Sequence, residues 1–311
     1  MTVAEAKVYG SKVLSQSPSP QLDVTVLLQE ITGLDKTKLL FSRERLLSKE
    51  EEELYKDWLS KRQTGLPVAY ITQKKEFYGY DFYVTPDVLI PKADTEILVE
   101  KALEILEEKI NSKINQKILS ICDMCCGSGC IALSVFKSAL ENKIITEENM
   151  PLFILADISS KALDVAKENS RRLLTEKQAQ NIRFIQTNLF DQVNRNFDLI
   201  LTNPPYIPSP LAKDLLKDGR SEPLLALDGD IDIEGNPTKE NDGLGIIRNL
   251  LPQAYSHLEA GGALLCESGE YNAEETCRIF KETGLKECKI HKDLEGQLRV
   301  TEGFKSFSES F

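Results

Sequence analysis

The sequence is poor in positive charge and contains no long apolar run. Lys and Arg together number 38 against 49 Asp and Glu, which gives a formal net charge of −11 and a pI near 5.0. Binding a nucleic-acid backbone by charge alone needs a basic surface, so this balance argues against a nucleic-acid partner. No run approaches the roughly 18 apolar residues of a membrane span, and the amphipathic start at residues 1–7 does not resemble a secretory signal. We therefore expect neither a membrane anchor nor a nucleic-acid substrate.

Histidine is scarce, and paired cysteine motifs are missing. The seven cysteines are an odd number spread through apolar segments, which is typical of a protein of the reducing cytoplasm. Four of them lie within residues 122–130 and suggest a metal site, but the CxxC…CxxC arrangement is not there, so we expect no metal. The two histidines, His257 and His291, have no partner motif and are expected to be structural.

Residues 1–65 are predicted to form a domain of four short amphipathic helices. The second helix begins at Ser19-Pro20, a capping residue followed by proline at the first helical position. A short third helix follows Asp35, and Ser48 with Glu51 forms a capping box for the fourth. The bundle carries no catalytic cluster, so it is either a structural cap or a docking domain for a macromolecular substrate.

Residues 66–95 are predicted to connect this bundle to a larger domain. Two aromatic-rich runs, 67–72 and 76–84, meet near Gly79 and are interpreted as a β-hairpin. An extended connector then leads to a helix that begins at Asp94. Clefts at such junctions are common ligand sites.

Strand and helix signals alternate from residue 117 onward, the pattern of a parallel sheet covered on both faces. The last two strands are separated only by residues 292–296, too short for a parallel crossover, so they must pair antiparallel. We therefore expect an α/β fold whose catalytic domain, 96–311, is a doubly wound sheet ending in an antiparallel hairpin, preceded by the small all-α domain. The acidic segment Asp228–Gly243 lacks a core pattern and is expected to be a solvated loop. The expected strands cover 117–123, 152–157, 182–187, 197–202, 262–267, 286–291 and 297–302.

The first three strands are followed by glycine or polar residues at one edge of the sheet, where open α/β sheets bind ligands. A glycine loop after the first strand lets the backbone approach a ligand at a helix N-terminus, although its spacing is not GxGxxG. Asp157 ends the second strand, where a carboxylate either takes both hydroxyls of a ribose or caps a helix. After the third strand, Asn188 is suited to an adenine edge and Leu189 to its face. The loop after the first strand consists of Asp123, Met124, Cys125, Cys126, Gly127, Ser128, Gly129 and Cys130.

The tetrapeptide Asn203-Pro204-Pro205-Tyr206 follows the fourth strand. Proline has no N–H for the ladder and restricts the residue before it, so two prolines stop the strand and stiffen its end. The segment presents a side-chain amide, backbone carbonyls and an aromatic ring at the ligand-binding edge. Taken alone, it could equally be a Pro-Pro loop whose Asn caps a turn. The order of the four motifs favours a binding platform.

The motif order and the terminal antiparallel pair resemble class I S-adenosylmethionine-dependent methyltransferases, and Asn-Pro-Pro-Tyr resembles their amino-methylating branch. Residues 20–302 are similar to the protein-(glutamine-N5) methyltransferases of translation release factors, the HemK/PrmC family. The resemblance implies S-adenosylmethionine as cofactor and a class I peptide chain release factor as substrate, methylated at the glutamine of its Gly-Gly-Gln motif. The matching stretches are 67–71, 77–79, 82–84, 88–96, 222–229, 242–244 and 293–300.

The same resemblance implies roles for individual residues. The side-chain oxygen of Asn203 and the carbonyl of Pro204 would accept both hydrogens of the substrate NH₂, while Pro205 and Tyr206 hold the platform and wall the substrate. Substrate contacts are also implied for Leu89 and Pro91 in the connector. Cofactor contacts are implied for Asp123, Cys125, Cys126, Gly127, Ser128, Gly129, Asp157, Asn188, Leu189 and Asn203.

The sequence departs from that family's pattern in four places. Cys125 stands where the family usually has glycine, and Asn188 replaces a usual Asp. Lys92-Ala-Asp94 replaces Arg-Pro-Glu, and the loop after Asp228 is longer than usual. None of these changes removes a group that the chemistry needs.

Two other functions stay open at this point. A nucleic-acid adenine-amino (N6) methyltransferase would use the same platform on a base flipped against the Tyr206 ring, but the acidic charge and the lack of a basic segment argue against it. A cofactor-binding regulatory protein without turnover is compatible with the changes at Cys125 and Asn188. We expect the protein to be a monomer.

Overall fold

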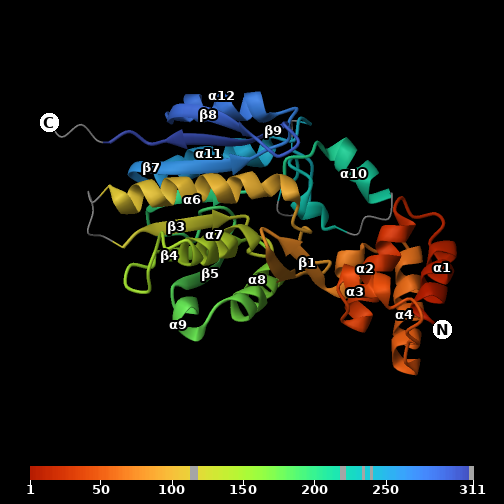
Figure 1. The fold of residues 1–311 in the computed structure, drawn as a ribbon. Helices are drawn as coiled ribbons and strands as arrows, with labels where there is room; N and C mark the ends of the chain where they lie inside the picture. The colour runs from red at the N-terminus through yellow and green to blue at the C-terminus, as the bar shows by residue number, and fades with distance from the viewer. Residues whose placement is uncertain (113–117, 218–221, 233–234, 239–240, 308–311) are drawn as a thin grey trace. The chain divides into compact units, whose positions relative to one another are not determined.

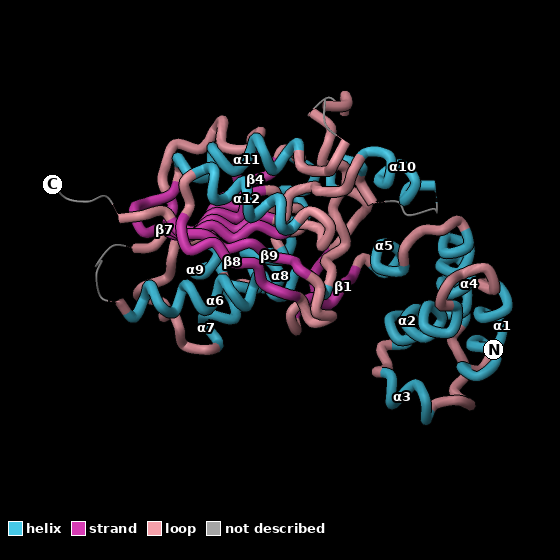
Figure 2. The backbone as a smooth tube through the Cα atoms, turned by 90° about the horizontal axis from the view of Figure 1, so that it is seen from above, coloured by secondary structure: helices cyan, strands magenta, loops and turns pink. Residues whose placement is uncertain are grey.

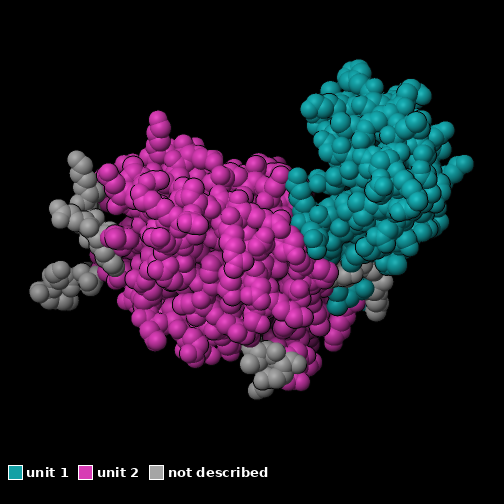
Figure 3. All heavy atoms as spheres, turned by 90° about the horizontal axis from the view of Figure 1, so that it is seen from below, with its two compact units in different colours: residues 1–74, 214–221 teal, residues 75–213, 222–311 magenta. Residues whose placement is uncertain are grey.

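The computed structural model describes residues 1–112, 118–217, 222–232, 235–238 and 241–307. The chain divides into two compact units, shown in different colours in Figure 3. The first contains Met1–Lys74 and the described part of 214–221, and the second contains Lys75–Lys213 and the described residues from Glu222 onward. Each unit has its own hydrophobic core.

The first unit is a helical bundle, as the periodicity predicts. Its core includes Leu27, Leu28 and Tyr55, whose hydroxyl donates to the carbonyl of Ala6 at 2.9 Å. The predicted capping box of Ser48 is present. The helices are α1 Val3–Val13, α2 Pro20–Thr32, α3 Lys36–Phe41, α4 Lys49–Gln63 and α5 Val68–Thr72.

The predicted cap at Ser19 is not formed by its side chain. The Ser19 hydroxyl instead donates to Oδ1 of the buried Asp23 at 3.1 Å, one turn into the helix. Asp23 Oδ2 also accepts from Nε of Arg62 at 2.8 Å. The serine is therefore drawn into a polar network that ties α2 to α4.

The predicted hairpin is shorter and more local than the sequence suggested. Residues 67–72 do not form a strand but enter helix α5, which buries Tyr70 and Ile71. The hairpin consists of β1, Lys74–Phe77, and β2, Tyr80–Tyr83. The two residues between the strands, Tyr78 and Gly79, both have positive φ, 51° and 77°, as a two-residue type I′ turn requires. Because the turn has only two residues, β1 pairs with β2, the strand that follows it directly. Residues 67–72 therefore lie outside the hairpin.

The second unit is built on a seven-stranded sheet in the order β5-β4-β3-β6-β7-β9-β8, and its first five strands are parallel. Strand β9 pairs antiparallel with both β7 and β8, so the predicted terminal hairpin and the predicted fold class are confirmed. The strand predicted at 262–267 is longer and begins at Leu258. The strands are β3 Ser120–Met124, β4 Leu152–Asp157, β5 Ile182–Gln186, β6 Phe197–Thr202, β7 Leu258–Glu267, β8 Lys286–Lys292 and β9 Leu298–Phe304.

Helices cover both faces of this sheet. Alternate residues of each strand enter two separate apolar clusters, as for Ile121 and Cys122 of β3. One cluster lies against α6, α7 and α8, and the other against α11 and α12; Figures 1 and 2 show these two helical layers. The helices of this unit are η1 Ala93–Thr95, α6 Glu96–Asn111, α7 Cys130–Glu141, α8 Ser160–Leu173, α9 Glu176–Ala179, α10 Ser209–Lys217, η2 Leu224–Ala226, α11 Gly245–Ser256 and α12 Ala273–Thr283.

The prediction that Asp228–Gly243 is a solvated loop is wrong for residues 228–231 and Gly243, which are buried, whereas residues 232, 235–237 and 241–242 are exposed as expected. Asp228 and Asp230 are fully buried. Both oxygens of Asp228 lie 2.7 Å from the hydroxyl of Ser209, and Asp230 accepts from the backbone N–H of Gly243 at 2.8 Å. These donors satisfy the buried carboxylates, which composition alone could not reveal. Residues 233–234 and 239–240 lie outside the described residues.

None of the described helices is both long enough and apolar enough to cross a bilayer.

Candidate active site

A cavity of about 530 Å³ lies in the second unit. It opens beside the carboxyl ends of β3, β4 and β6, which end next to one another in the sheet. Its size is in the range of pockets that hold a drug-sized ligand. The remaining walls include the connector 87–95, residues 187–189 after β5, the segment 223–232 and helix α11.

Most of the residues singled out by sequence line this one cavity. Four of them do not line it: Asp123, Gly129, Pro204 and Tyr206. The lining residues among the predicted set are Leu89, Pro91, Cys125, Cys126, Gly127, Ser128, Asp157, Asn188, Leu189, Asn203 and Pro205.

Asp157 ends β4 with its carboxylate at the cavity wall. One oxygen accepts from the N–H of Gly127 in the glycine loop and the other from the N–H of Ser159, both at 2.9 Å. The helix cap itself is Ser159, whose hydroxyl accepts from Ala162, so Asp157 is not the cap of α8. Burial raises the pKa of Asp157, while the backbone donors from Ser159 and Gly127 lower it. Each oxygen still has lone-pair capacity toward the cavity.

Asp123 lies behind the glycine loop rather than on the cavity wall. It is fully buried, and Oδ2 accepts from the N–H of Ala132 in the first turn of α7 at 3.1 Å. Burial raises the pKa of Asp123 to about 7. Its visible role is to hold the start of α7, whose N-cap is Gly129 with φ 75°.

Cys125, which stands where the family usually has glycine, has a backbone conformation that is strained for a residue with a side chain. Cys125 has φ 61°, in the left-handed region where a Cβ is strained by roughly 1–2 kcal/mol. The loop nevertheless keeps the turn that glycine usually makes, and the Cys125 side chain packs against the apolar cluster beneath the sheet edge.

The cysteines of residues 122–130 do not gather around a metal site. Burial raises the pKa of Cys122, Cys125 and Cys126, which favours the thiol over the metal-binding thiolate. Among the residues that the structure describes, no three His, Cys, Asp or Glu side chains are grouped to hold a metal ion.

Asn203 follows β6 and lies at the cavity wall with its amide oriented by a neighbour. Its Nδ2 donates to the hydroxyl of Thr95 at 3.4 Å. Within the described part of the chain, neither Oδ1 of Asn203 nor the carbonyl of Pro204 accepts a hydrogen bond. Two neighbouring oxygen acceptors are therefore left for a ligand that carries an NH₂ group.

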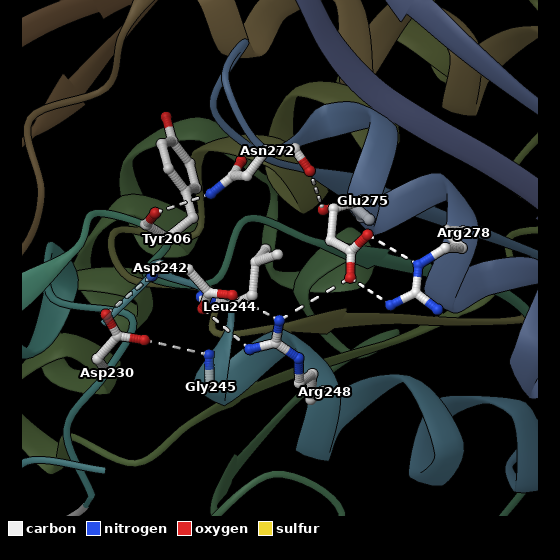
Figure 4. A network of polar contacts seen from close by, with 11 residues as sticks. Tyr206, Asp230, Asp242, Leu244, Gly245, Arg248, Asn272, Glu275 and Arg278 are labelled. Carbon is white, nitrogen blue, oxygen red and sulfur yellow. Dashed lines mark hydrogen bonds and ion pairs between the residues drawn. The ribbon is translucent and has the colours of Figure 1, made fainter. Parts of the chain in front are cut away.

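The far end of the tetrapeptide is held from α12. The carbonyl of Tyr206 accepts from Nδ2 of Asn272 at 3.1 Å and from the hydroxyl of Tyr271 at 3.2 Å. Figure 4 shows Asn272 reaching Tyr206 from the start of α12. The phenol of Tyr206 points elsewhere and donates to Glu267 at 3.2 Å.

An ion-pair network joins α12 to α11 and to the acidic segment (Figure 4). Arg248 of α11 lies 2.6 Å from Asp242 and 4.0 Å from Glu275 of α12. Asp230 accepts from the N–H groups of Gly243 and Gly245 at the start of α11, at 2.8 and 3.4 Å. These contacts connect the elements that support the tetrapeptide from behind.

The acidic segment packs directly on the tetrapeptide through two glycines. A Cβ at Gly229 would overlap the carbonyl of Gly243 and come within 2.9 Å of the Pro205 carbonyl. A Cβ at Gly243 would overlap the carbonyl of Tyr206. Residues 207 and 228 also form a parallel bridge, with Ile207 N–H to Leu227 O at 2.9 Å. The longer acidic segment is thus part of the site's framework.

Two buried glutamates were not found by the sequence reasoning. Glu222 accepts from Lys92 at 2.8 Å and from the N–H of Ile90 at 3.2 Å, which joins the connector to the segment 223–232. Glu267 ends β7 beneath the tetrapeptide. Polar residues at the carboxyl ends of strands mark the site. Applied also to β7, this rule would have found Glu267.

The two histidines lie outside the cavity and make structural contacts. The His257 ring stacks on Phe190, and its nitrogens lie within 3.1 Å of the carbonyls of Gln253 and Val193. His291 pairs with Glu302 at 2.8 Å across the terminal hairpin.

Comparison with known proteins agrees with this arrangement. Residues 5–72 match the family model of the PrmC N-terminal domain, and residues 96–217 match that of the methyltransferase small domain. A release factor glutamine methyltransferase of Leptospira interrogans is 36% identical over 285 residues, covering 91% of this chain and 90% of that protein. The chain belongs to the release factor glutamine methyltransferase family. The relative from Haemophilus influenzae, with the same name, is 33% identical and covers 91% of each chain.

A solved structure shows the same fold at low sequence similarity. The catalytic domain of human Mettl16, crystallised with an RNA hairpin, matches 98% of this chain and 92% of its own, with a TM-score of 0.53 and 13% identity. At that identity the likeness concerns the class I methyltransferase fold alone. The expected family and fold are thereby confirmed, whereas the roles of individual site residues stay predictions.

The close packing of Gly229 leads to a testable prediction. Gly229→Ala should lower the free energy of unfolding by about 1–3 kcal/mol, because the added methyl displaces backbone that cannot move freely. It should also lower methyl-transfer activity, because the displaced backbone is that of Pro205. Chemical denaturation and initial rates measure the two effects.

Gly296→Ala is the matched control. Gly296 has φ 85° in the β8–β9 turn and no atom within 4 Å of an added Cβ, so this change brings strain without overlap. Its activity should equal that of the unchanged protein. Full activity of Gly229→Ala would show that the segment does not support the tetrapeptide.

Proposed function

We propose that this protein transfers a methyl group from S-adenosylmethionine to the side-chain amide nitrogen of a glutamine in peptide chain release factors, at their Gly-Gly-Gln motif. The observation that carries the proposal is a pair of unengaged acceptors in consecutive residues, Oδ1 of Asn203, which lines the cavity, and the carbonyl oxygen of the adjoining Pro204. The names of the relatives support the same reaction and do not favour an adenine methyltransferase.

The residues around the cavity fit S-adenosylmethionine. Asp157 offers a carboxylate for the two ribose hydroxyls, and the Gly127 backbone lies within reach of it. Leu189 and Asn188 together supply an apolar face and a polar edge for an adenine. We assign these residues to cofactor binding, with Asp123 acting from behind through α7.

The chemistry asks the protein mainly to position the acceptor. When bound, the cofactor supplies a methyl group already activated by its sulfonium charge. An amide nitrogen is a poor nucleophile, because its lone pair is delocalised into the carbonyl. Asn203 and Pro204 accept the two N–H hydrogens and aim the nitrogen at the methyl group.

The hydrogen bonds to these same two acceptors should strengthen during the reaction. Positive charge builds on the nitrogen as the N–C bond forms and the C–S bond breaks, so hydrogen bonds to its N–H groups strengthen in the transition state. The methylated nitrogen then gives up one proton to solvent. No nucleophilic side chain and no strong base are needed.

The bundle at residues 1–65 has a separate role in this proposal. We assign it to docking the release factor, because it carries no catalytic cluster and residues 5–72 match the PrmC N-terminal model. The remaining domain boundaries follow as 66–95 for the connecting segment and 96–311 for the catalytic domain. A cytoplasmic, monomeric enzyme is the corresponding expectation.

The decisive experiment is methyl transfer from labelled S-adenosylmethionine, with purified release factor and unmethylated DNA or RNA offered side by side. Label should appear on the release factor and be lost when its Gly-Gly-Gln glutamine is replaced. Label on nucleic acid would support the adenine methyltransferase instead. Cofactor binding without any transfer would support a regulatory protein.

Asn203→Ala should lower the methyl-transfer rate by at least about 100-fold, the scale seen when a transition-state hydrogen-bonding group is removed. Affinity for the cofactor should stay nearly unchanged, because Asn203 acts on the acceptor. Steady-state rates and isothermal titration calorimetry measure the two quantities. Asn111→Ala, at the exposed end of α6, is the control. Substantial activity in Asn203→Ala would refute its role.

Asp157→Ala should instead weaken binding of the cofactor. Loss of the carboxylate removes both ribose contacts and releases the N–H of Gly127, so cofactor affinity should fall by about 10- to 100-fold or more. Calorimetric titration with S-adenosylmethionine checks this. Asp164→Ala, at an exposed position of α8, serves as the control. An unchanged dissociation constant would remove Asp157 from the cofactor site.

A further inference from the structure

The loop after β5, residues 187–193, holds a strained residue beside the cavity. Leu189 lines the cavity and has φ 48°, in the left-handed region that a residue with a Cβ rarely adopts. Strain of this kind persists only where the surrounding contacts hold the backbone in place. Asn188, the residue before it, lines the same cavity. The contacts that hold this loop therefore set how both residues face a ligand.

One of these contacts comes from a helix that is distant in the chain. The start and the end of the loop are held locally: the N–H of Thr187 donates to the carbonyl of Asp157 at 3.0 Å, and that of Val193 to the carbonyl of Phe190 at 2.9 Å. The N–H of Phe190, directly after the strained residue, instead leaves the loop and donates to Oε1 of Gln253 in α11 at 3.3 Å. A side chain of α11 thus holds the loop at the point where its backbone is strained.

The amide of Gln253, which lines the cavity, is oriented by α11 itself. Its Nε2 donates to the carbonyl of Asn249, one turn earlier, at 3.0 Å. Because this bond engages the nitrogen, the oxygen is the atom that faces Phe190. One turn later, the His257 ring stacks on the Phe190 ring with their centres 4.6 Å apart. Two consecutive turns of α11 therefore hold Phe190, by its backbone and by its ring.

The same loop carries two backbone donors at the cavity. Among the described residues, the N–H groups of Asn188 and Leu189 have no partner in the protein. A backbone N–H can bond to N1 of adenine, which is an acceptor, but not to the N1–H of hypoxanthine, which is a donor. The preference between these two purines therefore depends on the direction of the loop backbone.

We propose that Gln253 is a positioning residue for the cofactor site. By accepting from the N–H of Phe190, it holds the strained backbone at Leu189 in the direction that suits the adenine of S-adenosylmethionine. The inference rests on the cofactor assigned in the proposed function, and it extends that assignment from the residues that face the adenine to one that holds them. Gln253 acts through the loop, since both polar atoms of its amide are engaged within the protein.

The test is Gln253→Met in the full chain, because methionine has nearly the same shape but no acceptor for the buried Phe190. Calorimetric titration should show a dissociation constant for S-adenosylhomocysteine that rises about 10-fold, the scale of leaving one buried N–H without its acceptor. The dissociation constant for S-inosylhomocysteine, in which hypoxanthine replaces adenine, should rise less. The preference for adenine should therefore shrink, which a general loss of stability would not cause.

Steady-state kinetics should separate this role from one in catalysis. The KM for S-adenosylmethionine should rise with the dissociation constant, whereas the turnover number at saturating cofactor should change little. The reason is that the tetrapeptide is supported from the other end of α11, where the N–H of Ile246 donates to the carbonyl of Gly229 at 2.9 Å. Gln253 makes no contact there.

Two further variants serve as controls. Gln253→Glu keeps an acceptor oxygen for the N–H of Phe190 and should retain most of the affinity and of the preference for adenine. Gln192→Met makes the same exchange at an exposed position of the same loop and should bind both ligands like the unchanged protein.

The outcomes distinguish this inference from the proposed function. Unchanged dissociation constants in Gln253→Met, or an equal rise for both ligands, would overturn the role of Gln253 in holding the loop for adenine. An unchanged protein that binds S-adenosylhomocysteine but does not label the release factor would overturn the proposed function and leave this inference standing. An unchanged protein that binds neither ligand would overturn both.

Discussion

The two consecutive prolines at the end of β6 are the constraint on which the site depends. Pro204 and Pro205 have no N–H to give a neighbouring strand, so the backbone after Thr202 cannot be held by the sheet ladder. It is held instead by contacts from chain-distant segments. The N–H of Ile207 bonds to the carbonyl of Leu227, and the carbonyl of Tyr206 accepts from Asn272. Gly229 and Gly243 pack against the backbone of the segment.

The carbonyl of Pro204 and the amide oxygen of Asn203 are left out of these contacts. The same constraint thus immobilises the segment and keeps its two acceptors available.

Several of the acidic residues are buried and hold loops of the site in place. Asp228 and Asp230 are buried, yet their recorded donors are a serine hydroxyl and backbone N–H groups rather than Lys or Arg. Asp157 is satisfied in the same way by Gly127 and Ser159. Carboxylates that are paired with backbone donors order loops without needing a cation for each one. A count of charges therefore describes solubility and partners, and says little about how many acids lie inside.

Sequence reasoning succeeded where the signal is local and periodic. The strands of the large sheet, the antiparallel end and the common edge of the motifs all follow from apolar runs and short connections, and Gly127, Asp157, Asn188 and Asn203 do line one cavity. It failed where the partner is distant in the chain. The composition of 228–243 could not show that Ser209 and Gly243 would satisfy its aspartates, nor could residues 67–72 show that the Tyr78-Gly79 turn would pair β1 with β2 alone. Glu222 and Glu267 were missed because their roles appear only when Lys92 and Tyr206 are placed beside them.

The platform explains the chemistry better than it explains the choice of substrate. Two oxygen acceptors suit any planar NH₂ group, whether it belongs to a glutamine amide or to an adenine, so Asn203 and Pro204 cannot discriminate between them. Discrimination has to come from the walls that limit what reaches the platform. In this chain those walls are Val88, Leu89 and Pro91 of the connector, with Pro223, Leu225 and Ile231 of the segment that follows Glu222. They are apolar, and Lys92 and Ile90 hold one wall to the other through Glu222. Under the proposed function, specificity therefore depends on the distance between two segments that flank the reacting group, whereas reactivity depends on the prolines that end β6.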